Sequence, residues 1–83
     1  MVEVKAEVKK GDSRAVLDII VAFCKESNLE LVPYQRGIFD EPDSHYTLVW
    51  INIPKVRSVP LLSVALKHAL VKFEVRNLTV TAA

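Results

Sequence analysis

The sequence is poor in several features that would point to a particular chemistry. It contains one cysteine, Cys24, so no disulfide can form within the chain, which fits a reducing compartment. Its 11 Lys and Arg nearly balance 10 Asp and Glu, so the clustered excess of cations that non-specific nucleic-acid binding requires is missing. The longest apolar stretch, Val59 to Leu66, is far shorter than the ~20 residues of a membrane-spanning helix. We therefore expect a soluble, cytoplasmic protein.

Residue patterns typical of catalytic or metal sites are also missing from the sequence. The segment from Asp40 to His45 is rich in acidic residues, but its spacing matches no calcium-binding loop. Neither His45 nor His68 has a cysteine or serine at a spacing that would form a nucleophile pair. We predict no enzymatic activity, no cofactor and no metal site.

Apolar residues, in contrast, are abundant. The chain has 83 residues, enough for one domain with a single two-layer core. Hydrophobic residues make up 51% of it, and its mean hydropathy is +0.23. This is more apolar material than one small core needs. The excess predicts a surface that is buried against a partner, either a second copy or another chain.

Alternation of polar and apolar residues predicts three strands before the last helix. Residues 2–9 alternate aliphatic and charged side chains, which is typical of a strand with one buried face. Residues 29–34 and 45–53 are predicted as the second and third strands. The segment between them, 35–44, contains glycine, proline and other turn-forming residues and is predicted as a long hairpin loop.

Two helices and a final strand complete the predicted fold. Asp12 or Ser13 offers an N-cap for a helix to about Asn28, and Ser58 offers one for a second helix. Residues 71–81 are rich in β-branched side chains and predict a last strand, although the second helix could continue to about residue 76. The order β-α-β-β-α with this strand predicts one α+β domain over residues 1–83. We expect a two-layer sandwich with an antiparallel-rich sheet and both helices on one face.

The third strand raises the question of what covers its second face. Alternation along "HYTLVWINIP", residues 45–54, directs Val49 and Ile51 to the helices and the other set outward. Covering a tryptophan and two tyrosines would gain on the order of 10 kcal/mol gross, at about 25 cal/mol per Å². We therefore expect a partner, in a homo- or heterodimer, to contact the outward residues of the second and third strands, which are Val32, Tyr34, Tyr46, Leu48 and Trp50. The alternative is that the terminal segment or the 35–44 loop folds over this face.

The outer sides of the helices suggest a second contact. Val21 shares the polar sector of the first helix, and Val64 and Val71 lie among the polar residues of the second. Single exposed valines are ordinary. Three on neighbouring helices would suit a shallow docking surface for another subunit.

Binding of RNA or phosphate is the alternative function. Lys55 and Arg57 precede the predicted second helix, whose free amides and dipole favour an anion, and Arg36 in the predicted hairpin loop could join them. An RNA-recognition motif is disfavoured, because the outer face of the first strand carries Glu3 and Glu7 where that family needs an aromatic.

The chain as a whole resembles the small dimerising subunits of the KEOPS complex, the archaeal and eukaryotic assembly that makes threonylcarbamoyladenosine in tRNA. The resemblance rests on the charge-alternating first strand, an aliphatic helix, "LVPYQR" at residues 31–36, a hydrophobic third strand and a serine-started, leucine-rich last helix. It implies a non-catalytic accessory subunit that pairs through its sheet and offers its helices to a catalytic subunit. Any contact with tRNA would then be indirect.

Overall fold

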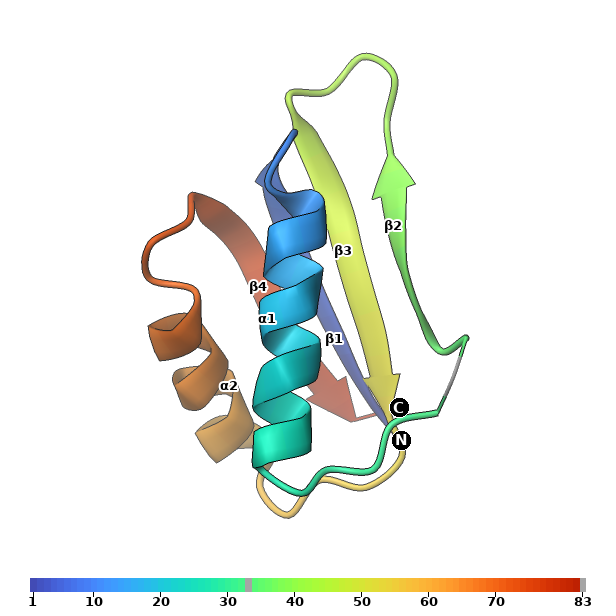
Figure 1. The fold of residues 1–83 in the computed structure, drawn as a ribbon, viewed down its shortest axis with the longest axis vertical. Helices are drawn as coiled ribbons and strands as arrows, with labels where there is room; N and C mark the ends of the chain where they lie inside the picture. The colour runs from blue at the N-terminus through green and yellow to red at the C-terminus, as the bar shows by residue number, and fades with distance from the viewer. Residues whose placement is uncertain (33, 83) are drawn as a thin grey trace.

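The computed structural model describes residues 1–32 and 34–82. It shows a four-stranded antiparallel sheet with two helices packed on one face (Figure 1), which confirms the predicted fold class. The strands lie in the order β2-β3-β1-β4 across the sheet. The elements are β1 (Val2–Lys9), α1 (Ser13–Glu26), β2 (Arg36–Asp40), β3 (Tyr46–Ile53), α2 (Val59–Ala69) and β4 (Val75–Ala82).

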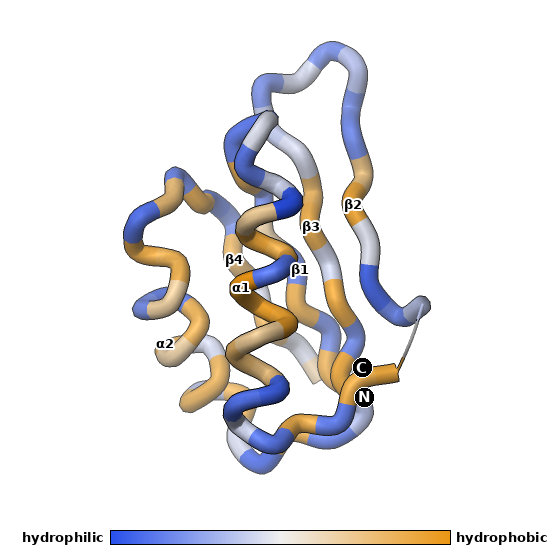
Figure 2. The backbone as a smooth tube through the Cα atoms, in the orientation of Figure 1, coloured by the Kyte–Doolittle hydropathy of each residue, from blue (hydrophilic) through white to orange (hydrophobic). Residues whose placement is uncertain are grey.

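The core lies between the helices and the inner face of the two central strands. Hydrophobic and hydrophilic residues alternate along β1, as Figure 2 shows. Along β3 the burial alternates, so that in both strands every second side chain points to the helices. The buried side chains of the core include Val4 and Val8 of β1 and Ile20 of α1. The one buried polar side chain among the described residues is Thr47, whose hydroxyl donates to Oδ1 of Asp40 at 2.6 Å. The predicted inward set of the third strand is therefore correct.

The predicted second strand is wrong. Residues 29–32 lie in the connection after α1, and the strand beside β3 is β2, inside the segment predicted as a hairpin loop. Leu29 and Leu31 do pack against the core, as an alternating pattern requires, but from a loop. Pro33, which lies outside the described residues, is a residue that disfavours a strand at this place in the sequence. The predicted hairpin is therefore shorter, with residues 41–45 between its strands.

Both helices begin where the sequence suggests, but only one is capped by a side chain. Asp12 occupies the N-cap of α1 and makes no side-chain cap bond, and α1 ends at Glu26 rather than near residue 28. Ser58 caps α2, because its hydroxyl accepts from the backbone N–H of Leu61 at 3.3 Å. Within residues 1–32 and 34–82, neither helix is long and apolar enough to cross a membrane.

The last strand is present, and it sets where the two ends of the fold lie. α2 ends at Ala69, so a helix continuing to residue 76 is excluded, and β4 pairs antiparallel with β1. Val2 pairs with Ala82, which places the start of the first strand beside the end of the last, as Figure 1 shows. The register shifts between Lys5 and Glu7, where Asn77 adopts a positive φ of 53°.

Candidate interaction surface on the open sheet face

The sheet has an outer face, which is the side that the two helices leave open. Its residues follow from the alternation of each strand and from the pairing between strands. One half of the outer face, on β2 and β3, is mostly apolar; the other half, on β1 and β4, is polar and charged. The apolar half consists of Gly37, Phe39, Tyr46, Leu48, Trp50 and Asn52, and the polar half of Glu3, Lys5, Glu7, Lys9, Arg76, Thr79 and Thr81.

Trp50 lies in the apolar half and is held sideways against the neighbouring strand. Its partner across the ladder is Gly37, and a methyl group added to Gly37 would lie 2.9 Å from Nε1 of the indole. The indole therefore lies over the glycine backbone, in space that any side chain at position 37 would occupy. This contact leaves Trp50 half-buried in the single chain, with part of its ring still open.

Phe39 is the most exposed large side chain of the apolar half. It is 56% exposed, and it pairs across the ladder with Leu48, which is half-buried. Together with Trp50 they form a contiguous hydrophobic cluster, called here the β2–β3 patch (Phe39, Leu48 and Trp50). Phe39 was missed in the sequence, because residues 35–44 were predicted as a loop. The alternation of Ile38 inward and Phe39 outward is the signal that could have found it.

Tyr46 also lies on the outer face, but its own chain covers part of it. The guanidinium carbon of Arg76 stacks 3.6 Å from the centre of the tyrosine ring, a cation–π contact. The hydroxyl of Tyr46 donates to Oε1 of Glu74 at 3.4 Å. Tyr46 remains half-buried, so Arg76 of β4 supplies part of the cover that the prediction assigned to a partner.

Glu7 connects this cover to the charged row of β1. Nδ2 of Asn77 donates to Oε1 of Glu7 at 2.6 Å, and Nε of Arg76 donates to Oε2 at 3.1 Å. The hydrogen bond from Asn77, and then the bond and charge of Arg76, lower the pKa of Glu7, while desolvation opposes them. Lys5 forms a separate ion pair with Glu3 at 3.3 Å. Glu3, Lys5 and Glu7 are thus already paired in the single chain.

Val32 and Tyr34 are not part of this face, contrary to the prediction. Both lie in the connection between α1 and β2, with Val32 38% and Tyr34 94% exposed. Tyr34 lines a groove of about 720 Å³ between α1 and β2, together with Arg14 and Arg36. The alternative expectation, that the terminal segment or the hairpin loop covers the outer face, is also wrong, because these segments form the edge strands β4 and β2.

The predicted surface on the helices is only partly present. Val64 and Val71 are 53% and 76% exposed, but Val21 is half-buried and packs against the core. Leu61, one helical turn before Val64, is 71% exposed and was missed. Its spacing of three residues from Val64 places both on the same side of α2.

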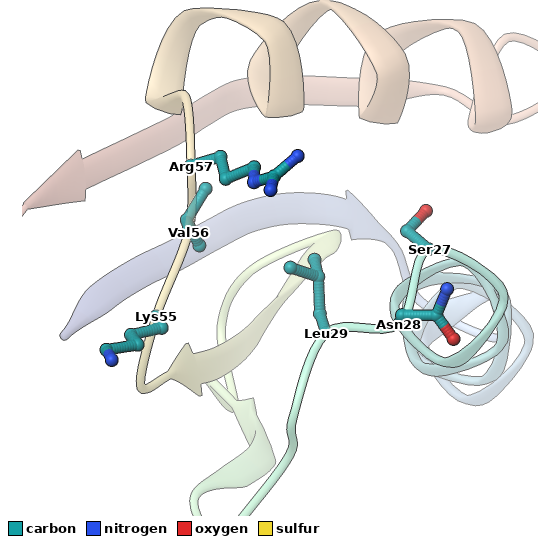
Figure 3. Close-up of a pocket in the computed structure, with 6 residues that line it drawn as sticks. All are labelled: Ser27, Asn28, Leu29, Lys55, Val56 and Arg57. Carbon is teal, nitrogen blue, oxygen red and sulfur yellow. The ribbon is translucent and has the colours of Figure 1, made fainter.

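The predicted anion site is divided between two places. Lys55 and Arg57 line one cleft of about 670 Å³, beside the end of α1, whereas Arg36 lies in the groove with Tyr34. In Figure 3, Arg57 extends across the cleft towards Ser27, and the side chain of Lys55 points away from it. The two cations therefore do not converge on one point. Within the described ranges, no group of three or more His, Cys, Asp or Glu residues could hold a metal ion.

No protein family matches this chain. No curated protein matches it either. Its fold is similar to that in the crystal structure of a formyltetrahydrofolate deformylase from Pseudomonas putida KT2440, with a TM-score of 0.73 and 12% sequence identity. The match covers 99% of this chain and 28% of the deformylase chain, so the chain spans little more than a quarter of that enzyme's length. At this identity the likeness shows the fold alone, a small α+β sandwich.

Proposed function

We propose that this chain is a non-catalytic interaction module that binds a partner polypeptide on the outer face of its sheet. The observation that carries the proposal is the β2–β3 patch. Three large apolar side chains lie side by side on neighbouring strands, and Phe39 is more than half exposed although the sheet is fully formed. A contiguous apolar cluster of this kind is typical of a protein interface.

Physical considerations favour a polypeptide partner over a small ligand at this place. The patch is spread over two extended strands, where alternate side chains present a broad, pleated surface rather than an enclosed cavity. An aromatic side chain buries roughly 150–250 Å² when it is fully covered, so completing the cover of Phe39 and Trp50 is worth several kcal/mol, at about 25 cal/mol per Å². A flat partner surface, such as a second sheet, can supply that cover.

The finer proposal is that this module is an accessory subunit of the KEOPS complex. It is supported by the resemblance in the sequence, which extends over nearly the whole chain. The fold found here has the element order on which that resemblance rests. Purification of the tagged chain from its native source should then recover the other KEOPS subunits in stable proportion. Recovery of a different set of proteins would reject KEOPS and leave the interaction module in place.

Site-specific photocrosslinking tests the module itself. A photoreactive phenylalanine analogue at position 39 should form an adduct with a partner polypeptide in native cells, because that side chain points from the outer face. The same analogue at position 30, an exposed site in the connection between α1 and β2, is the matched control. An adduct at both positions, or at neither, would contradict the proposal. The mass of the adduct tells a second copy from another protein.

Binding of RNA or phosphate at Lys55 and Arg57 is a second proposal with less support. Both side chains line one cleft, but they diverge, and the N–H of Leu61 at the start of α2 is already bonded to Ser58. Titration of the chain with tRNA at two salt concentrations tests it. Binding that weakens steeply with salt would support this function, and a null result at low salt would remove it.

A further inference from the structure

The charged residues of β1 follow a pattern with a particular symmetry. Glu3, Lys5, Glu7 and Lys9 all lie on the outer face and alternate in sign. When the row is read backwards, every position carries the opposite charge. Two such rows that face each other and run in opposite directions therefore place Lys5 against Glu7 and Glu3 against Lys9. The centre of this arrangement lies at Ala6, midway between Lys5 and Glu7.

The same centre relates complementary side chains on the neighbouring strands. Ala6 pairs with Val49, and Val49 pairs with Ile38, so one row across three strands marks the axis. A rotation of 180° about this row brings Leu48 of one copy onto Trp50 of the other. It also brings Phe39 of one copy onto Gly37 of the other, where the indole of Trp50 lies. The phenyl ring of Phe39 therefore meets the indole of Trp50 from the other copy, and two aromatic rings come into contact.

A two-fold axis parallel to the strands gives poorer contacts. If the axis lies over β1, each charge meets its own copy, for example Glu7 on Glu7. If it lies between β1 and β3, the ladder pairs place Leu48 on Glu7 and Trp50 on Lys5 of the other copy. If it lies between β2 and β3, only those two strands overlap and the charged half stays outside. The antiparallel arrangement is the one that joins the whole face with opposite charges.

The size of the face suits a modest dimer. Three strands of eight residues and β2 of five residues, about 4.8 Å apart and with about 3.4 Å per residue, give an area of roughly 500 Å² per copy. This is about a tenth of the total surface of 5494 Å², the share that standard interfaces bury in a small protein. Glu7 and Lys5 enter the interface already paired with Arg76 and Glu3, which reduces the cost of removing them from water.

We infer that the partner on the outer face is a second copy of this chain, packed face to face with its strands antiparallel about the Ala6–Val49–Ile38 row. This inference rests on the proposed interaction module and names its partner. The dimer is an isologous sandwich of two four-stranded sheets, with the helices of both copies on the outside.

Charge reversal tests both the partner and the orientation. Lys5→Glu makes positions 5 and 7 both negative, and Glu7→Lys makes them both positive, so each variant alone has two repelling contacts per dimer. Each should raise the dissociation constant about tenfold, as expected for two ion pairs turned into repulsions. An equimolar mixture of the two variants should restore dimerisation, because position 5 of each then faces an opposite charge at position 7 of the other. Sedimentation velocity over a range of concentrations gives the dissociation constants.

Matched controls separate this inference from the proposed function. Lys72→Glu makes the same change of charge at an exposed position after α2 and should leave the dissociation constant unchanged. Failure of the mixture to restore the dimer, or unchanged dimerisation of the single variants, would overturn the antiparallel arrangement. A wild-type chain that stays monomeric while position 39 crosslinks to another protein would overturn the second copy and leave the proposed function standing. Loss of the crosslink as well would reject both.

Discussion

The packing of Trp50 on Gly37 leads to a quantitative prediction for Gly37→Ala. The added methyl group would lie 2.9 Å from Nε1 and 3.0 Å from Cε2 of the indole, so the ring must move away from β2. Overpacking of this kind costs roughly 1–3 kcal/mol. Gly37 has no positive φ, so the alanine also restricts the unfolded chain, which offsets about 0.4–1 kcal/mol. We expect a net loss of about 1 kcal/mol, or roughly 4–8 °C in Tm for a domain of this size.

Fluorescence of Trp50 separates this mechanism from a general loss of stability. The chain contains one tryptophan, so its emission reports this side chain alone. In dilute Gly37→Ala protein, the emission should shift to the red and acrylamide should quench it more, because the displaced indole is more exposed. Gly11→Ala is the control. Gly11 has a φ of 97° and open space around it, so the variant should lose about 1–2 kcal/mol through backbone strain with unchanged emission. A Gly37→Ala protein that is as stable as the wild type and has the same emission would refute the packing described here.

Two titratable groups give further predictions. The hydrogen bonds from Asn77 and Arg76 hold the pKa of Glu7 below its ordinary 4.5. The stability that these bonds give the folded chain is present above pH 4.5 and is lost as the pH falls through the folded-state pKa. Urea unfolding at acidic pH should show this loss in the wild type and not in Glu7→Gln. Burial raises the pKa of the Cys24 thiol from 9.0 to about 11, so a thiolate-specific reagent at neutral pH should label the folded chain slowly and the urea-unfolded chain at the ordinary rate. The same shift should weaken folding as the pH rises from 9.0 towards 11, and fast labelling of the native protein would contradict it.

The sequence predicted the elements whose pattern is decided locally. Apolar and charged side chains alternate strictly over the eight residues of β1, and the apolar ones are all buried. A shift of the pairing by one residue would turn the charged side chains into the core, so the pattern fixes the register of this strand. The start of α2 is predicted by Ser58, which is an N-cap residue, and by Pro60 in the first turn. The fold class follows from the order of such elements, since packing both helices on one side of an antiparallel sheet is a common solution for this order.

The position of β2 could not be predicted in the same way. Residues 29–34 and 36–40 are two candidates for the second strand, and the choice between them depends on which one pairs with β3. The leucines of the first segment face the core in either case, so their pattern is equally satisfied by a loop. This one error moved Val32 and Tyr34 onto the outer face and removed Phe39 from it.

The contact of Arg76 with Tyr46 could not be predicted from the sequence for a different reason. Arg76 meets Glu7 because the register between β1 and β4 shifts after Lys5, and these two residues are 69 positions apart. A contact of this kind depends on an irregularity in a strand that the hydrophobic pattern does not mark. Charged residues at the far end of a chain can thus decide how much of an aromatic face is left for a partner.

The pairing of Val2 with Ala82 has a consequence for how such a unit can be combined with others. Because the chain comes in and goes out on adjacent strands at the same end of the sheet, the whole unit can be spliced into a surface turn of a host protein with only short joints on either side. For the same reason a brief tether would allow a circularly permuted version with new termini in the β2–β3 turn. A fold whose two ends are adjacent can be inserted into different host proteins without a change in its own structure.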